Sequence, residues 1–348
     1  MKRWLSWVRR RWLLLSLSLA FAVVVILQFG NLERLGLALA HGRSQWLFLA
    51  GLLQLAFYLL YAAQYHLGFA IMDVGSRWQE LVPVVFASVF LQAVVPSGGV
   101  SSLAVFVDDA SRRGQSPMRT AEGALLVLVA DLITMLPVIL YGVLYLFMLG
   151  VLPGYEMIVA AAGVAIYLLF GAALVFALLL GRWRPQELRR ALHWLQENLN
   201  WLAGLAGRPA LLAGDWADKQ AADEIAAARG LADRPRRLRG MLGIACAMQL
   251  INLSSLYVVS LAYRWPLGLG ALAAAFSMNV VFSVVNVIPH GLGTAEAIMA
   301  VVLAALGVAA PVAAAIAVAF RGLNIWLPLA VGFFFLRRVR SFGGEWSG

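Results

Sequence analysis

The chain has 348 residues, of which 62% are hydrophobic and 13% are charged, and its mean hydropathy is +0.84. Soluble domains are more polar than this, and apolar runs of about 20 residues recur along most of the chain, so the sequence indicates a polytopic inner-membrane protein. The formal net charge of +10 is therefore first a matter of membrane orientation. The lone cysteine, Cys246, excludes an internal disulfide and argues against a cysteine metal cluster.

The start of the chain combines basic residues with an apolar stretch, and the "ALA" at 38–40 resembles a signal-peptidase site. The apolar run from Trp12 to Phe29 is longer than the hydrophobic region of a signal peptide, and many more apolar segments follow it. We therefore predict an uncleaved membrane anchor.

Two of the apolar segments are interrupted in the middle by proline and glycine. In chain order the segments cover residues 12–30, 46–71, 81–107, 120–148, 157–180, 240–262, 268–307 and 311–336. We predict an all-α polytopic membrane protein with about six full spans and two re-entrant or broken helical hairpins, at 81–107 and 268–307. The arms of the first hairpin are short for full spans, which favours re-entry. For the second hairpin, re-entry and two full crossings both stay open.

The basic residues are divided unequally between the two sides of this arrangement. If each hairpin returns to the side from which it entered, 23 of the 27 Lys and Arg residues fall in loops on one side. The opposite loops hold only Arg34, Arg43 and Arg264, and Arg321 lies within the last span. This bias predicts a bacterial-type cytoplasmic membrane protein with both termini in the cytoplasm and with residues 150–156 and 263–267 outside. The positive charge then serves orientation and contact with anionic lipid, and we expect no nucleic-acid partner.

The one sizeable polar region is a predicted cytoplasmic loop at 181–239. Its leucines at 188, 192, 195, 199 and 202 follow 4-3-4-3 spacing, which predicts an amphipathic helix that lies on the membrane surface or packs on a second helix beginning near Asp215. We interpret 181–239 as a connector between two membrane halves, 1–180 and 240–348.

The two breaks resemble each other in sequence. "VVPSGGVSS" at 94–102 aligns with "VIPHGLGTA" at 287–295, so that prolines and glycines match. A glycine stands 18 residues beyond each proline (Gly114 and Gly307), and a proline that suits the first turn of a helix follows at 117 and 311. Because the charge pattern places the two hairpins on opposite sides, we predict an inverted-topology repeat, as in secondary transporters.

These motifs resemble a known family. "PSGGVSSLAVFVDDASRRGQS", "IPHGLGTAEAIMAVVLAALGV" and the arginine-containing "AVAFRGLNIWLP" are similar to the signature regions of the lysylphosphatidylglycerol synthase transmembrane (flippase-like) family, over residues 10–340. Many members carry Gly-Glu-x-x-Arg after the first proline, whereas here Gly99 is followed by Val100, Ser101 and Ser102 and the charges come only at 108–113. The resemblance implies a lipid flippase, without the soluble aminoacyltransferase domain of two-domain members, so synthase activity is not implied.

Each break is expected to mark an internal polar site, because irregular backbone at membrane depth persists only when it is buried in protein or lines a wet cavity. The helices that restart after Gly99 and Gly293 present free N–H groups and a positive dipole end, which suit lipid phosphate. Thr294 either caps its helix or contacts a ligand.

Three ionisable residues lie within apolar segments, where such residues are functional candidates. Glu296 and Arg321 either form a structural pair or line the lipid path, and we predict that they lie close together. Asp131 either pairs with Arg321 or relays protons. His290, at the second break, is either a titratable group or a hydrogen-bonded spacer.

The leading hypothesis is a lipid translocase that moves an aminoacylated phospholipid, a polyprenyl-phosphate glycan or a hopanoid-like lipid between leaflets. The alternatives are an ion-coupled transporter of small solutes and, with less support, an intramembrane lipid-modifying enzyme. We expect no cofactor and no metal, membrane lipids as partners, and a separate enzyme as the source of the lipid. The predicted translocation site comprises Pro96, Gly98, Gly99, Ser101, Ser102, Asp131, Pro289, His290, Gly291, Gly293, Thr294, Glu296 and Arg321.

Overall fold

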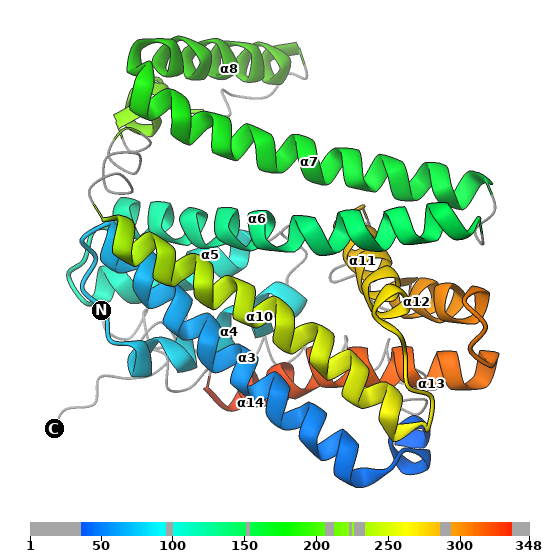
Figure 1. Ribbon diagram of the computed structural model, residues 1–348. Helices are drawn as coiled ribbons and strands as arrows, with labels where there is room; N and C mark the ends of the chain where they lie inside the picture. The colour runs from blue at the N-terminus through cyan, green and yellow to red at the C-terminus, as the bar shows by residue number, and fades with distance from the viewer. Residues whose placement is uncertain are drawn as a thin grey trace, which may run out of the picture.

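The computed structural model describes residues 36–94, 100–150, 154–205, 212–222, 225, 234–285 and 294–335. These ranges are almost entirely helical, which confirms the predicted all-α class (Figure 1). The elements are α3 (Ser44–Ile71), α4 (Trp78–Val94), α5 (Val100–Arg112), α6 (Pro117–Leu149), α7 (Gly154–Trp183), α8 (Pro185–Leu205), α10 (Pro235–Ala262), α11 (Leu269–Val285), α12 (Thr294–Ala305), α13 (Ala310–Arg321), the π-helix η2 (Gly322–Trp326) and α14 (Leu327–Phe335).

Four helical runs in the described part are long and apolar enough to cross a membrane. They are α3, α6, α10 and the continuous run Ala310–Phe335, which joins α13, η2 and α14. The helices α4, α11 and α12 are shorter and apolar. The predicted span at 12–30 lies outside the described residues.

The loops gather at two opposite ends of the bundle (Figure 1). The start of α3, the end of α6, the end of α10 and the α12–α13 turn lie at one end, which we call the Arg43 end. The end of α3 and the starts of α4, α6 and α10 lie at the other, which we call the Arg234 end. The α4–α5 pair begins and finishes at the Arg234 end, whereas the α11–α12 pair begins and finishes at the Arg43 end.

Each of these helix pairs has its own hydrophobic core. One core joins α4 and α5 to the second half of α3, the start of α10 and α14. The other joins α11 and α12 to the start of α3, the end of α10 and α13. A helix pair therefore stands at each of the two segments predicted to be broken, 81–107 and 268–307, and each pair packs within one core.

Glycines allow the closest helix crossings. A Cβ on Gly68 of α3 would lie 2.7 Å from the Gly123 carbonyl oxygen of α6, and a Cβ on Gly142 of α6 would collide with the Ala273 carbonyl of α11. Small residues at such crossings let membrane helices approach closely where lipid gives no hydrophobic drive between them.

The proline and glycine positions matched between the two halves have the same local structure. Pro117 and Pro311 both stand in the first turn of a helix, as predicted. Gly114 and Gly307, just before them, both adopt left-handed backbone, with φ of 75° and 91°. Glycine suits these turns because it has no Cβ to clash there.

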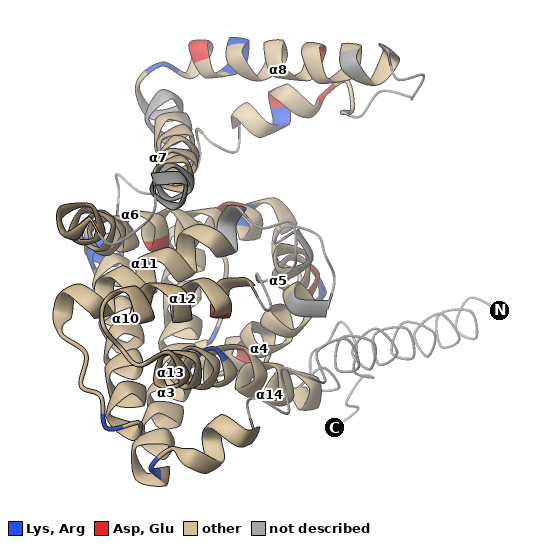
Figure 2. Cartoon of the chain, turned by 90° about the vertical axis from the view of Figure 1, so that its right-hand side faces the viewer, with Lys and Arg blue, Asp and Glu red and all other residues tan. Residues whose placement is uncertain are grey.

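Outside the bundle, α8 lies beyond α7, away from α3 and α13 (Figure 2). The predicted amphipathic helix is present, and it packs on the helical stretch 216–222, which is one of the two expected arrangements. Gln196 bridges the two helices, because it donates to the Gly214 carbonyl at 3.2 Å and accepts from the Ala217 N–H at 2.9 Å. Near the entry to α10, Arg234 donates to the last carbonyls of α3, at Ala70 and Ile71, and so ties the end of the connector to the bundle.

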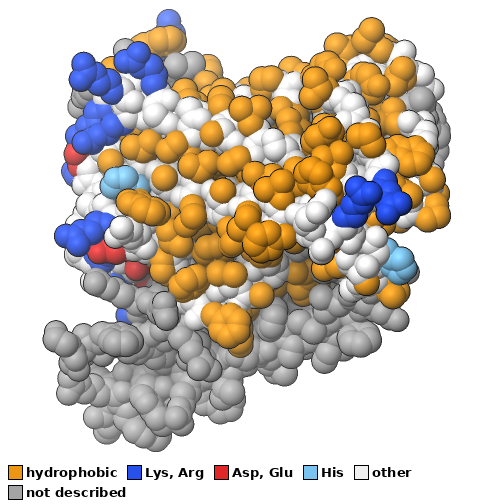
Figure 3. All heavy atoms as spheres, turned by 60° about the horizontal axis from the view of Figure 1, so that its bottom comes forward, with side chains coloured by type: hydrophobic (Ala, Val, Ile, Leu, Met, Phe, Trp, Pro, Cys, Tyr) orange, Lys and Arg blue, Asp and Glu red, His pale blue; other side chains and the backbone are white. Residues whose placement is uncertain are grey.

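The surface between the two ends is apolar. On one face, hydrophobic side chains form a broad band with charged residues at its two margins (Figure 3). The exposed side chains include Phe48, Leu52, Leu55 and Leu59 along α3. Such a band is what a lipid-facing surface requires.

Candidate functional site

The Glu296 carboxylate and the Arg321 guanidinium form an ion pair inside the bundle, as predicted. Arg321 Nε donates to Glu296 Oε1 over 3.2 Å, and only 8% of the arginine side chain and 17% of the glutamate side chain are exposed. The pair joins the first turn of α12 to the end of α13. The carboxylate also lies in the first turn of α12, where a negative side chain interacts favourably with the positive end of the helix dipole.

The helix lengths place this pair deep between the two ends of the bundle. Arg321 is the last of the 12 residues of α13, so it lies about 17 Å along the helix from the Arg43 end. Glu296 lies about 14 Å from the last residue of α12 at the same end. Half the thickness of a hydrocarbon core is about 15 Å, so the two charges are near the middle of the apolar layer.

A π-helix follows Arg321 directly, and a proline explains it. Pro328 has no N–H to donate to the carbonyl four residues earlier, which belongs to Asn324, and its ring crowds that carbonyl. The Asn324 carbonyl instead accepts a hydrogen bond of 2.9 Å from the Tyr58 hydroxyl of α3. Tyr58 is thereby held within electrostatic range of Arg321. The single predicted helix at 311–336 is thus interrupted by η2, and π-helical turns are frequent at functional sites.

Asp131 of α6 is hydrogen-bonded to α3 on the Arg234 side of Tyr58. The buried Gln64 donates from Nε2 to Asp131 Oδ1 over 2.8 Å. Of the two predicted partners for Arg321, the structure pairs Glu296 with it and gives Asp131 a glutamine. Asp131 also lies within electrostatic range of Tyr61 and Tyr65, whose hydroxyls are 3.4 Å apart.

Helix α3 carries a row of polar residues past both charged centres. Gln54, Tyr58, Tyr61 and Tyr65 are spaced 4-3-4, so they share one side of the helix, with Gln64 beside them. At the end nearer Arg43, Gln54 donates to the Ser255 hydroxyl of α10 over 3.1 Å. We call this row of five residues the α3 polar stripe.

Several amide oxygens near the α3 polar stripe are buried and have no hydrogen-bond partner within the described ranges. They belong to Gln54, Gln64, Gln249 and Asn252. Buried polar atoms are normally hydrogen-bonded, so unpaired acceptors mark places where a water molecule or a ligand donor fits.

The other predicted site residues divide into three groups. Thr294 begins α12, next to the ion pair, and Ser102 is partly buried in α5. Ser101 lies in the first turn of α5, but its side chain is outside the described part. The residues of the breaks themselves also lie outside the described ranges: Pro96, Gly98, Gly99, Pro289, His290, Gly291 and Gly293.

The charged residues that replace the family pattern after the first break pair with one another. Arg112 donates to Asp108 over 2.8 Å and Arg113 donates to Asp109 over 2.9 Å, both at the α5 end. Arg113 also donates to the Gly75 carbonyl at the turn before α4. These four charges stabilise the Arg234 end and do not reach the Glu296–Arg321 pair.

The α3 polar stripe was missed in the sequence, although its 4-3-4 spacing was readable there. It was hidden because most residues around it are apolar, so the segment reads as an ordinary span. Among the residues that the structure describes, no group of three His, Cys, Asp or Glu side chains is arranged to hold a metal ion.

The comparisons with known proteins gave one finding. The family model described as the lysylphosphatidylglycerol synthase TM region matches residues 13–332. A search of the curated proteins and a search of the solved structures returned no match.

Proposed function

Since the chain belongs to the lysylphosphatidylglycerol synthase transmembrane family, in its membrane part, we propose that it is a flippase that moves a phosphate-bearing lipid between the two leaflets. Its multi-pass membrane character follows from the family and from the apolar helices. Of the substrates named from the sequence, an aminoacylated phospholipid and a polyprenyl-phosphate glycan carry the phosphate that this proposal requires, whereas a hopanoid-like lipid does not.

The observation that carries this proposal is the Glu296–Arg321 pair at mid-depth, next to the α3 polar stripe. A lipid head group with phosphate and ammonium needs both a cation and an acceptor to cross an apolar layer, where an unpaired charge costs several kcal/mol. Arg321 supplies the cation for phosphate, and Glu296 supplies the acceptor for ammonium. The buried amide oxygens of Gln54 and Gln64 add acceptors for hydroxyl or ammonium hydrogens along the same helix.

The lengths of the two helix pairs support a re-entrant arrangement around the proposed path. The α4 and α11 helices have 17 residues, α5 has 13 and α12 has 12, so each spans about 18–26 Å and falls short of a hydrocarbon core of about 30 Å. We propose that both pairs are re-entrant and form an inverted repeat, which would place the two breaks near mid-depth on opposite sides of the site.

We further propose that the Arg234 end is cytoplasmic and that the membrane is a bacterial-type cytoplasmic membrane. The described arginines at positions 77, 112, 113, 119, 234, 236, 237 and 239 fall at this end, against Arg43 and Arg264 at the other. Such a bias is the usual signal of the cytoplasmic side.

The test is a translocation assay with the purified full chain in vesicles. A phospholipid with a fluorescent tag is placed in both leaflets, and an impermeant reductant bleaches whatever reaches the outer leaflet. We expect full bleaching in vesicles that hold the protein and bleaching of the outer leaflet alone in empty vesicles. A small water-soluble solute trapped in the same vesicles is the control, because its release without lipid movement would favour a solute transporter and contradict the proposal.

A further inference from the structure

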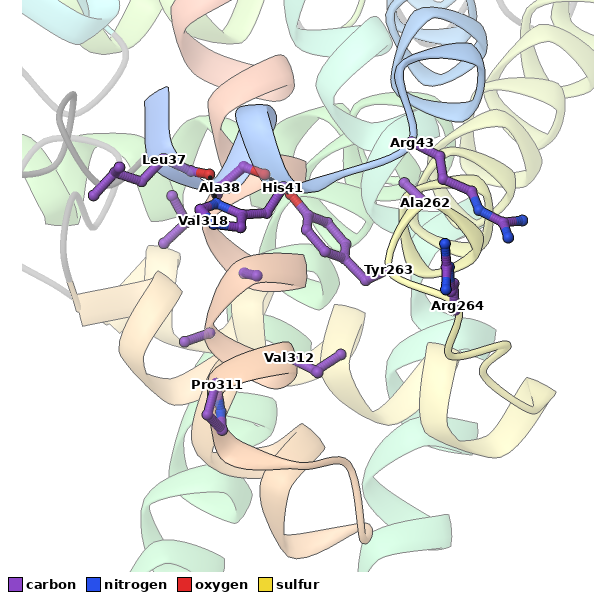
Figure 4. A pocket seen from close by; sticks show the side chains of 12 residues that line it. Leu37, Ala38, His41, Arg43, Ala262, Tyr263, Arg264, Pro311, Val312 and Val318 are labelled. Carbon is purple, nitrogen blue, oxygen red and sulfur yellow. Dashed lines mark hydrogen bonds between the residues drawn. The ribbon is translucent and has the colours of Figure 1, made fainter.

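A second polar feature lies at the Arg43 end of the bundle. A cavity of about 530 Å³ opens between the stretch 36–43, the α10–α11 junction and α13 (Figure 4). Its volume falls in the range of roughly 300–1,000 Å³ that ligand pockets occupy. Neither Glu296 nor Arg321 lines it, so it is distinct from the proposed translocation site. We call it the rim cavity.

Hydrogen bonds from the end of α10 hold the walls of the rim cavity together. The Tyr263 hydroxyl donates to the Ala38 carbonyl over 2.7 Å, and the Arg43 N–H donates to the Ala262 carbonyl over 3.1 Å. Burial raises the pKa of Tyr263 to about 12, so its hydroxyl keeps its proton and stays a donor at neutral pH. The stretch 36–43 is thereby fixed across the end of α10.

The polar lining of the rim cavity is cationic. Arg43 comes from the residue before α3 and Arg264 from the turn after α10, and their side chains lie near each other, whereas His41 lies on the other side of Tyr263 (Figure 4). Within the described ranges, neither guanidinium forms an ion pair with a carboxylate. Two arginines next to one opening, without an acidic partner, form a site that attracts an anion such as phosphate.

The backbone at Arg264 adds an independent observation. Its φ is +59°, and the Trp265 N–H donates to the Ser260 carbonyl over 3.1 Å, so Arg264 occupies the left-handed position of a helix-ending turn. Glycine is strongly favoured there, and in the described part of the chain it occupies three of the other four left-handed positions, Gly114, Gly150 and Gly307, with Asp73 at the fourth. An arginine that persists in a strained conformation points to a function of its side chain.

The rest of the cavity lining is apolar and leads toward the translocation site. Pro311, Ala314, Ala315 and Val318 of α13 form one wall. These residues recur every three or four positions, so they share a side of the helix, and Arg321 is the next residue in the series. The step from Val318 to Arg321 is about 4.5 Å along the helix axis.

We propose that the rim cavity binds one anionic phospholipid, with its phosphodiester between Arg43 and Arg264 and an acyl chain along the apolar wall of α13. The apolar wall is the reason to choose a lipid over free phosphate, which would use the arginines alone. With the Arg234 end cytoplasmic, the bound lipid belongs to the outer leaflet. That it passes along α13 to or from Arg321 rests on the proposed flippase function; its binding does not.

The test is native mass spectrometry of the full chain in non-ionic detergent, titrated with phosphatidylglycerol or with phosphatidylethanolamine of the same acyl chains. The test variant is Arg43→Gln with Arg264→Gly, which removes both charges and relieves the strained turn, so thermal stability should not fall. The matched control is Arg77→Gln with Arg119→Gln, which removes two exposed arginines at the other end.

We expect the wild type and the control to bind one phosphatidylglycerol more tightly than phosphatidylethanolamine, and the test variant to bind it about tenfold more weakly or worse. Ala314→Trp, which fills the apolar wall at an exposed position, should weaken phosphatidylglycerol binding while the protein stays folded. Equal binding of phosphatidylglycerol by the test variant and the control would overturn the proposal. Competition by inorganic phosphate at concentrations similar to those of the lipid would show an anion site and overturn the choice of a lipid. Because binding is measured without vesicles, a failed translocation assay would not change either result.

Discussion

At the scale of single residues, the site depends on the carbonyl of Asn324, which accepts no hydrogen bond from the residue four positions later in its own helix. Pro328 cannot donate to the Asn324 carbonyl, and the Tyr58 hydroxyl takes that place. The bond links residues 266 positions apart and fixes the first half of the chain against the helix that carries Arg321. The hydrogen bond that Pro328 removes from its helix is therefore partly replaced by the bond from Tyr58, which joins the two halves of the chain.

This account predicts that removal of the Tyr58 hydroxyl destabilises the protein by an amount that depends on Pro328. Tyr58→Phe should lower the free energy of unfolding by about 0.5–1 kcal/mol, the usual size of a hydrogen bond between membrane helices. In a Pro328→Ala background, the new N–H can donate to Asn324, so Tyr58→Phe should cost less. Unfolding of the four proteins in bicelles measures this coupling. Equal costs in both backgrounds would contradict the assigned role of Pro328.

At the scale of helices, two close crossings without large side chains set the geometry of the bundle. Gly142 of α6 leaves room for the Ala273 carbonyl and the Ser277 hydroxyl of α11, and that hydroxyl donates to the Val138 carbonyl over 2.9 Å. On the other side, Gly332 of α14 packs directly on the Phe86 carbonyl of α4. Each short hairpin is therefore tied to a spanning helix by contact with a glycine.

Gly142→Ala should consequently separate α6 from α11 and lower the free energy of unfolding by about 1–3 kcal/mol, as overpacking does. The matched control is Gly51→Ala in α3, where an added Cβ would meet nothing within 4 Å. Alanine has the higher helix propensity, so the control should unfold at the same free energy or at one up to about 1 kcal/mol higher. Thermal unfolding in detergent compares the two variants. If Gly51→Ala lost stability and Gly142→Ala did not, the assigned role of Gly142 would be contradicted.

The helices themselves were largely predictable from the sequence, because apolar length, proline and glycine act locally. The first turns at Pro117 and Pro311 and the amphipathic α8 all follow from a few adjacent residues. The π-helix was missed although Pro328 was visible, since the sequence does not show whether a proline kinks a helix or widens it. The hydrogen-bond partners of the charged site residues were less predictable from the sequence. The contact of Asp131 with Gln64 crosses 67 positions and depends on packing; only the Glu296–Arg321 pair, in one half of the chain, was predicted.

At the scale of the whole molecule, the fold gives the chain two chemically different ends and an apolar band between them. Helix α3 runs from the Arg43 end to the Arg234 end, and α6 and α10 run in the opposite direction (Figure 1). Most described arginines lie at one end, and the two that line the rim cavity lie at the other. The charge distribution therefore predicts the orientation of the protein in the membrane. It also means that the described part of the Arg43 end carries few arginines besides the two that line the rim cavity.

Cysteine labelling tests this orientation. In a Cys246→Ser background, which removes the one native thiol, Ser44→Cys marks the start of α3 and Met118→Cys marks the start of α6; both positions are exposed. A membrane-impermeant thiol reagent should label the cysteine at 44 in intact cells and the cysteine at 118 only after lysis. Labelling with the opposite pattern would invert the topology, with the termini outside.

The central claim, that lipid crosses the membrane by way of the Glu296–Arg321 pair, is tested most directly by the double variant Glu296→Gln with Arg321→Gln in the vesicle translocation assay. Either single change leaves a buried charge without its partner, which typically costs about 3–5 kcal/mol, so loss of activity there could reflect loss of folding. The double variant keeps a hydrogen-bonding pair without charge, and its unfolding in detergent should return to near the wild-type value. We predict that this folded variant translocates no more lipid than empty vesicles do. Translocation at the wild-type rate would contradict the claim and leave the pair with a purely structural role.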